Sequence, residues 1–237
     1  MGYFFSSYPC GVKYANRDDI ALVYADAPCN CIVLATRNRV KAAPVLLSLD
    51  RKNNPVRAIL VNSGNANACT GEQGLRDITA LTDETARLLE IDPLSVLAAS
   101  TGVIGVPLPV NRMMNALPHL TANLAQDTVD GFSRAIMTTD TVPKVVSESF
   151  TTSRSTYTIT AVSKGSGMIA PDMATLLSFV LCDAPISRID MDSCFRKAVE
   201  ISLNSITIDG DMSTNDSAFL LCPADGSYLS APEDIAS

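Results

Sequence analysis

Residues 164–180 read KGSGMIAPDMATLLSFV and predict a buried strand that follows an unusual turn. Residues 176–180 form a short apolar run that is typical of a strand in a protein core. Upstream, the glycines of KGSG permit backbone angles that other residues avoid, and Pro171 fixes its own φ. The strand is entered through Ala174 and Thr175, so a hydroxyl stands where a constrained turn meets the core.

The hydroxyl of Thr175 has a chemical use in this setting. It could attack the carbonyl carbon of Ala174 if the turn holds that peptide in a strained geometry. Cleavage would free the α-amino group of Thr175, whose reference pKa of about 7.7 to 8.0 leaves a useful neutral fraction near pH 7. An N-terminal threonine is a known nucleophile that supplies its own base, so no histidine is needed. A plain buried threonine is the simpler interpretation of these residues by themselves.

The composition fits a soluble globular chain of 237 residues, because 47% of them are hydrophobic and 18% are charged. No stretch reaches the ~18 uninterrupted apolar residues of a membrane span, and the N-terminus lacks the pattern of a secretory signal. We therefore expect a cytoplasmic protein that does not use a membrane. The net charge of −7 and the lack of a basic run argue against nucleic-acid binding.

The seven cysteines lie mostly in apolar stretches, which is typical of reduced thiols in a reducing compartment. Cys29 and Cys31 are the only close pair. A zinc site would need a second such pair or partnering histidines, and the chain has one histidine, His119. We expect no metal site. The single histidine also makes a Ser-His-Asp triad unattractive.

Strand and helix patterns interleave without a regular βαβ rhythm. Short β-branched runs predict strands at residues 19–25, 31–36, 56–62, 94–100, 144–150, 155–163 and 217–222. Helical spacing of apolar residues predicts helices at residues 73–89 with a cap at Thr70, 110–124 with an interruption at Pro118, 129–137 and 191–203. This order favours a layered α+β sandwich of helices and sheet over a doubly wound sheet.

Three polar segments are candidates for chemistry. NSGNANACTGEQG, residues 62–74, could cradle an anion at a helix N-terminus but matches neither the dinucleotide nor the P-loop pattern, so a structural turn is the simpler interpretation. DGDMSTND, residues 209–216, lacks the glycine and glutamate that a calcium loop requires. STGVIG, residues 100–105, places a hydroxyl and backbone N–H groups at a strand end, where they could bind developing negative charge.

Five motifs together resemble the ornithine acetyltransferase family of arginine biosynthesis, also called glutamate N-acetyltransferase or bifunctional ArgJ. They occur in order and span nearly the whole chain: NSGNANACTG, STGVIG, MTTDTVPK, KGSGMIAPDMATLLSF and DGDMSTND. The resemblance implies the family's α+β layered sandwich, which is of the N-terminal-nucleophile type. It also implies self-cleavage between Ala174 and Thr175, which would give an α chain of residues 1–174 and a β chain that starts with residues 175–237.

The activity implied by the resemblance is an acyl transfer in two steps. Thr175 takes the acetyl group of N2-acetyl-L-ornithine, and L-glutamate then accepts it from the acetyl-threonine. The resemblance assigns the oxyanion pair to Thr101 and Gly102, and substrate contacts to Thr141, Lys164 and Thr175. It implies no cofactor or metal, leaves open whether acetyl-CoA also serves as a substrate, and implies a heterotetramer of α and β chains.

Members of this family continue well beyond 237 residues, and their later portion helps to close the substrate site. The resemblance therefore implies that the remainder of the β chain is missing, and the start of a helix at Ser230 and Pro232 agrees with this expectation. Two alternatives stay open. One is a hydrolase of the β-peptidyl aminopeptidase type, in which water accepts the acyl group. The other is an inactive truncated fragment that keeps the motifs only as turns.

Overall fold

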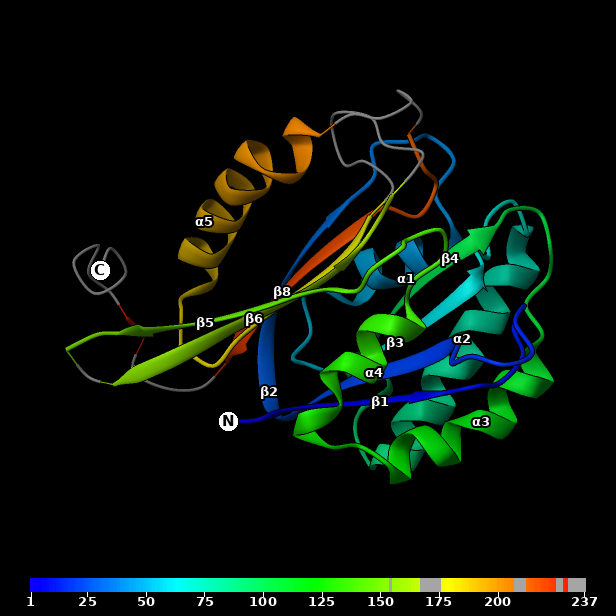
Figure 1. Cartoon of the computed structure of the whole chain (residues 1–237), viewed down its shortest axis with the longest axis horizontal. Coiled ribbons are helices and arrows are strands. Elements are labelled where there is room, and N and C mark those ends of the chain that lie inside the picture. The colour runs from blue at the N-terminus through cyan, green and yellow to red at the C-terminus, as the bar shows by residue number, and fades with distance from the viewer. Residues whose placement is uncertain (154, 167–175, 207–211, 225–227, 230–237) are drawn as a thin grey trace.

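The computed structural model describes residues 1–153, 155–166, 176–206, 212–224 and 228–229 (Figure 1). The first half of the chain contains β1 (Tyr3–Tyr8), β2 (Ile20–Ala35), α1 (Ala43–Arg51), β3 (Val56–Asn65), α2 (Gly71–Leu89), β4 (Val96–Val103) and α3 (Val110–Ala122). The second half contains α4 (Val129–Ala135), β5 (Lys144–Thr151), β6 (Thr156–Lys164), β7 (Leu177–Cys182), α5 (Arg188–Ile201) and β8 (Ser217–Pro223). Single 3₁₀ turns lie at Pro93–Ser95, Gln126–Thr128 and Leu203–Ser205.

These strands form one mixed sheet in the order β4-β3-β2-β8-β7-β6-β5, with β1 beside β2. β3 and β4 pair in parallel, as do β7 and β8, and the other neighbours are antiparallel. β2 joins the two halves, because its first part pairs with β1 and β3 and its second part pairs with β8.

The prediction of two separate strands at residues 19–25 and 31–36 is wrong, since both belong to β2. Pro28 misled the prediction because proline interrupts most strands. Here the pairing with β3 shifts register between Tyr24 and Cys29, and a proline is tolerated at such an irregularity.

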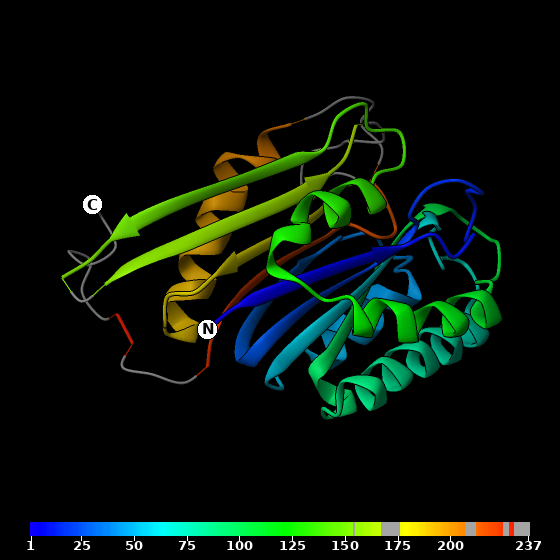
Figure 2. The same ribbon diagram turned by 60° about the horizontal axis from the view of Figure 1, so that its bottom comes forward.

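Side chains along the central strands alternate between two faces, which produces three buried layers. The inner faces of both halves of the sheet share one core, whose members include Val23, Ile59, Val61, Phe132, Phe179 and Phe219. The outer face of the first half packs against α2 and α3 through Ile20, Leu22, Leu60, Ile78, Leu81 and Leu117. The outer face of the second half packs against α5 through Ile32, Leu34, Leu220, Met191 and Phe195. Figure 2 shows the two strand layers between these helices, which is the predicted layered α+β sandwich.

Two helices differ from the prediction. α3 runs without interruption through Pro118, which is exposed, while Met113, Leu117 and Leu120 on the opposite face are buried and hold the helix against the core. α1 was not predicted at all, because its nine residues are too few to show a clear helical period. Thr70 does precede α2, but its hydroxyl donates to Asn67 Oδ1 instead of capping the helix.

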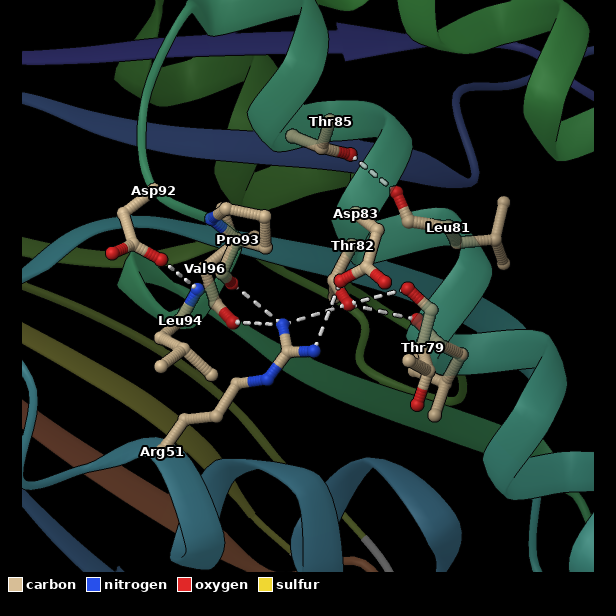
Figure 3. A network of polar contacts seen from close by, with 11 residues as sticks. Arg51, Thr79, Leu81, Thr82, Asp83, Thr85, Asp92, Pro93, Leu94 and Val96 are labelled. Carbon is tan, nitrogen blue, oxygen red and sulfur yellow. Dashed lines mark hydrogen bonds and ion pairs between the residues drawn. The ribbon is translucent and has the colours of Figure 1, made fainter.

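Arg51, at the end of α1, fixes the position of β4, the strand that ends at the candidate site. Its guanidinium donates to Thr82 Oγ1 of α2 at 3.0 Å, to the carbonyl oxygens of Pro93 and Val96 at 2.7 and 3.2 Å, and to Asp83 at 3.0 Å (Figure 3). Arg51 is only 6% exposed, so its guanidinium depends on these groups for its hydrogen bonds. Within the described ranges, no helix is long and apolar enough to cross a membrane.

Candidate active site

The ends of β4 and β6 meet through a buried lysine. Lys164, the last residue of β6, is 3% exposed, and its Nζ donates to Thr101 Oγ1 of β4 at 2.8 Å. The same ammonium donates to Thr138 Oγ1, just after α4, at 3.1 Å. Two of the residues that the sequence suggested for the site are therefore in direct contact, and Thr138 is a third member that the sequence analysis missed.

Acidic residues offset the cost of burying the Lys164 ammonium. Burial lowers the pKa of Lys164, while the charges of Asp140 and Asp216 act in the opposite direction. Burial also works against an ionised Asp140, but hydrogen bonds from Lys144 Nζ at 2.6 Å and from the N–H of Gly165 at 2.7 Å prevail, so the pKa of Asp140 lies below its usual range. The site therefore combines two lysines, Lys144 and Lys164, with the acidic residues Asp140 and Asp216.

Gly102 follows Thr101 in a conformation that only glycine adopts without strain. Its φ is +134°, and a Cβ there would lie 2.2 Å from the carbonyl carbon of Gly64 and 2.5 Å from the nitrogen of Asn65. Gly64 and Gly102 are register partners in the parallel pair of β3 and β4. The close approach of these two backbones sets the path of the STGVIG turn.

Asp216 directly precedes β8, and it binds the residue that leads into β7. Its Oδ1 accepts the N–H of Leu176 at 3.0 Å, and the N–H of Ser217 donates to the carbonyl of Leu176 at 3.0 Å. Asp216 is 1% exposed, and burial raises its pKa to about 7. Because Leu176 directly follows Thr175, these bonds fix the residue next to the suggested nucleophile.

The sequence model of the ArgJ family matches residues 5–235. The chain belongs to the ArgJ family. It is 46% identical over 221 residues to the arginine biosynthesis bifunctional protein ArgJ of Geobacter sulfurreducens, and this match covers 93% of the chain but 56% of that relative. The chain thus spans little more than half the length of this ArgJ relative.

Solved structures agree with the family and extend the likeness of the fold. The ornithine acetyltransferase of Mycobacterium tuberculosis, solved in complex with ornithine, is 34% identical with a TM-score of 0.67, covering 74% of this chain and 92% of that one. An L-aminopeptidase D-Ala-esterase/amidase of Ochrobactrum anthropi, described as a variant of the Ntn hydrolase fold, is 10% identical with a TM-score of 0.56 over 93% of this chain and 70% of that one. The second likeness concerns the fold alone and supports the N-terminal-nucleophile type of sandwich.

Three of the ArgJ motifs converge on one buried amide. Asn215 Nδ2 donates to the carbonyl of Ala66 at 2.6 Å and to the carbonyl of Ser100 at 2.8 Å. It thereby joins the STND, NSGNANACTG and STGVIG segments, which are far apart in the chain. The STND residues were not predicted to belong to the site, because a calcium loop was the only role considered for DGDMSTND. Four polar residues directly before the apolar strand β8 were the available signal.

Not every residue that the sequence suggested for the site contacts Lys164 or Thr101. Thr141 is exposed, and among the described residues no hydrogen bond connects it to Lys164. Its neighbour Asp140 makes the contacts with Gly165 and Lys144 instead. Ala174 and Thr175, as well as the suggested helix start at Ser230 and Pro232, lie outside the described residues. The strand expected to begin at Thr175 is assigned from Leu177.

Cys29 and Cys31 belong to the inner core of the sandwich and not to this site. Both face the shared core, and burial raises the pKa of the Cys29 thiol to about 12 and that of Cys31 further still. In the described part of the chain, no group of three or more histidine, cysteine or acidic side chains could hold a metal ion. The pair is therefore part of the hydrophobic packing.

Proposed function

We propose that the complete protein transfers the acetyl group of N2-acetyl-L-ornithine to L-glutamate in arginine biosynthesis, through an acetyl ester on Thr175. Membership in the ArgJ family supports this reaction. So does the likeness to an ornithine acetyltransferase whose structure was solved with ornithine. Self-cleavage between Ala174 and Thr175 would separate an α chain of residues 1–174 from a β chain that starts at Thr175.

The contact between Lys164 and Thr101 is the observation that carries the proposal. An ammonium has donors only, so the Thr101 oxygen must be the acceptor in this bond. The Thr101 hydrogen then remains to be donated elsewhere, and the adjacent cation makes it a stronger donor. A polarised hydroxyl beside the Gly102 backbone is the arrangement that stabilises an oxyanion during acyl transfer.

The two half-reactions use the same groups in opposite order. Thr175 Oγ attacks the acetyl carbon while its proton passes to the Thr175 amine, and ornithine leaves after it has received that proton. The glutamate amine then attacks the acetyl ester, loses a proton to the Thr175 amine and restores the threonine hydroxyl. We propose that no cofactor takes part. Acetyl-CoA, if used, would be an acetyl donor to Thr175 in the first half-reaction.

The sheet suggests how the two chains would stay together after cleavage. β6 of the α chain pairs with β7 of the β chain, and β2 of the α chain pairs with β8. The core side chains Val162, Phe179 and Phe219 also come from both sides of the cleavage point. We propose that the cleaved pair assembles further into a heterotetramer, which works in the cytoplasm on its two small-molecule substrates.

Purified complete gene product should test the proposal directly. Mass spectrometry should show two chains, the second starting at Thr175, and rates with acetylornithine and glutamate should give parallel double-reciprocal lines. Thr175→Ala should abolish cleavage and transfer, whereas Thr175→Ser should retain part of each. An uncut chain that is fully active would contradict the proposal. Release of free acetate at the same rate with and without glutamate would instead favour the hydrolase.

A further inference from the structure

We propose that Asp216 is a positioning residue for the reaction at Thr175, which it serves as a carboxylate and not only as a hydrogen-bond acceptor. One oxygen holds the peptide N–H next to Thr175, and the negative charge keeps the Lys164 ammonium in its working form. This inference rests on the proposed acetyl transfer and adds a residue to which that proposal gives no role.

The first argument is the place of the hydrogen bond. Asp216 Oδ1 accepts the N–H of Leu176 at 3.0 Å, across 40 residues of sequence. The carbonyl of Leu176 is held in turn by the N–H of Ser217 at 3.0 Å. Both polar groups of Leu176 are therefore bound, so the chain that enters β7 has little freedom at the residue bonded to Thr175.

The second argument is the other oxygen of the same carboxyl group. Asp216 is 1% exposed, yet its Oδ2 has no hydrogen-bond partner among the described residues. A buried carboxyl group with an unpaired oxygen is destabilising. An asparagine could accept the Leu176 N–H at much lower cost, so the hydrogen bond alone does not explain an aspartate here.

The third argument is charge. Lys164 and Asp216 are brought near each other by β7, because Lys164 pairs with Leu177 and Leu177 pairs with Ser217, the residue after Asp216. The Lys164 charge favours the ionised form of Asp216, and Asp216 in turn favours the charged form of Lys164. Around Lys164 stand Asp140, from the segment after α4, and Lys144 of β5. Thr36, which directly follows β2, brings no charge to this region, because only its backbone N–H donates to the main-chain carbonyl of Asp216. Lys164 is thus the cation that acts on Asp216.

These contacts give the Asp216 charge two effects on the chemistry. With Asp216 ionised, Lys164 stays protonated and can polarise the Thr101 hydroxyl. Because Asp216 binds the N–H of Leu176, the residue after Thr175, its charge should also favour the ammonium that forms when the Thr175 amine takes the hydroxyl proton. Asp216 itself gives and takes no proton in the transfer, so its protonation at low pH should slow the reaction.

The decisive measurement is the pH profile of kcat/KM for N2-acetylornithine with the complete, cleaved protein, since glutamate would add the titration of its own amine. Two groups must be deprotonated, the Thr175 amine and Asp216, so log kcat/KM should rise with a slope of about 2 on the acidic side. Asp216→Asn keeps an acceptor for Leu176 but has no charge. It should lower kcat by about 10- to 100-fold and reduce the slope to about 1, with little change in KM.

Asp183→Asn is the matched control. Asp183 follows β7 at the opposite end, and its Oδ1 accepts the N–H of Thr158 at 2.7 Å, so the same chemical change removes a strand-end carboxylate far from Lys164. This variant should keep kcat within about twofold and a slope of about 2. Mass spectrometry of each variant should confirm cleavage at Thr175 before its rates are compared.

The outcomes separate this inference from the proposed function. Absence of acetyl transfer by the wild-type protein would overturn the function itself. Transfer by the wild type together with an unchanged kcat and slope in Asp216→Asn would overturn only the role of Asp216. If Asp216→Asn does not fold or cleave, the wild-type profile decides alone. Because burial raises the pKa of Asp216 to about 7, a slope that stays near 1 down to pH 5 contradicts a required carboxylate.

Discussion

Lys164 Nζ lies 2.8 Å from Thr101 Oγ1, although 63 residues separate the two in sequence. The bond joins the end of β6 to the end of β4, on opposite sides of the inner core of the sandwich. It fixes the direction of hydrogen-bond donation, because only the threonine oxygen can accept. The Thr101 hydrogen is therefore available to the reacting group, and substitutions of Thr101 and Lys164 should change the rate of transfer accordingly.

Thr101→Val should reduce kcat by ~10² to 10³ with little change in KM, because the lost hydroxyl acts on charge that develops in the transition state. Thr138→Val is the matched control, since it removes the other acceptor of the same ammonium. It should cost less than about tenfold. Steady-state kinetics on cleaved protein would measure both, and equal losses in the two variants would argue against Thr101 as the oxyanion donor.

Lys164→Met and Thr101→Val should not be additive. If Lys164 acts by polarising the Thr101 hydroxyl, replacing the lysine in a protein that already lacks this hydroxyl should lower kcat only slightly further. The double variant should therefore be no more than a few-fold slower than the slower single variant. A loss equal to the product of the two single losses would mean that Lys164 acts independently, for example by anchoring a substrate carboxylate. A selective rise in KM for Lys164→Met would support that second role.

Gly102→Ala should destabilise the fold more than Gly105→Ala. Both glycines have positive φ, +134° and +80°, so both substitutions carry backbone strain of about 1 to 3 kcal/mol. Only Gly102 adds a collision, because its Cβ would lie 2.2 Å from the Gly64 carbonyl carbon, while nothing lies within 4 Å of the Cβ at Gly105. Chemical denaturation would compare the free energies of unfolding. Equal losses would show that β3 and β4 can separate without cost.

Asp216→Asn should raise the free energy of unfolding above that of the wild type, and by more at pH 8 than at pH 5. Burial raises the folded-state pKa of Asp216 from 3.8 to about 7, so the stability that its protonated form contributes is present below pH 4 and is lost as the pH rises through 7. Asparagine does not ionise and avoids this loss, which is worth up to about 4 kcal/mol. Unfolding free energies at the two pH values would test this. A difference between the proteins that is independent of pH would show that the carboxyl group has an ordinary pKa.

Arg51→Met should cost about 1 to 3 kcal/mol, because it removes the hydrogen bonds that a buried guanidinium donates to Thr82 Oγ1 and to the carbonyl oxygens of Pro93 and Val96. Arg76→Met is the control, since Arg76 pairs with Glu72 on the exposed face of α2 at 3.3 Å. Exposed pairs of this kind contribute about 0.5 kcal/mol or less. Thermal unfolding should separate the two variants clearly, and a small effect at Arg51 would mean that water replaces its hydrogen bonds.

The amino-acid sequence by itself determined those features that depend on near neighbours. Short β-branched and apolar runs predicted β3, β6 and β8, and the helical period predicted α2, because both patterns are set within a few residues. The motifs placed Thr101, Gly102 and Lys164 in one family-related set before any contact was known. The same local logic failed at Pro28 and Pro118, where packing outweighed the usual effect of proline.

Only the tertiary structure decided which of these residues meet. The contact of Lys164 with Thr101 and Thr138 depends on how the sheet folds back on itself around the inner core, and no local pattern encodes that distance. The bond from Leu176 to Asp216 depends on the parallel register of β7 and β8, which is set by core packing along both strands. Burial then changes the chemistry, because Lys164 and Asp216 have altered pKa values only once the surrounding strands exclude water.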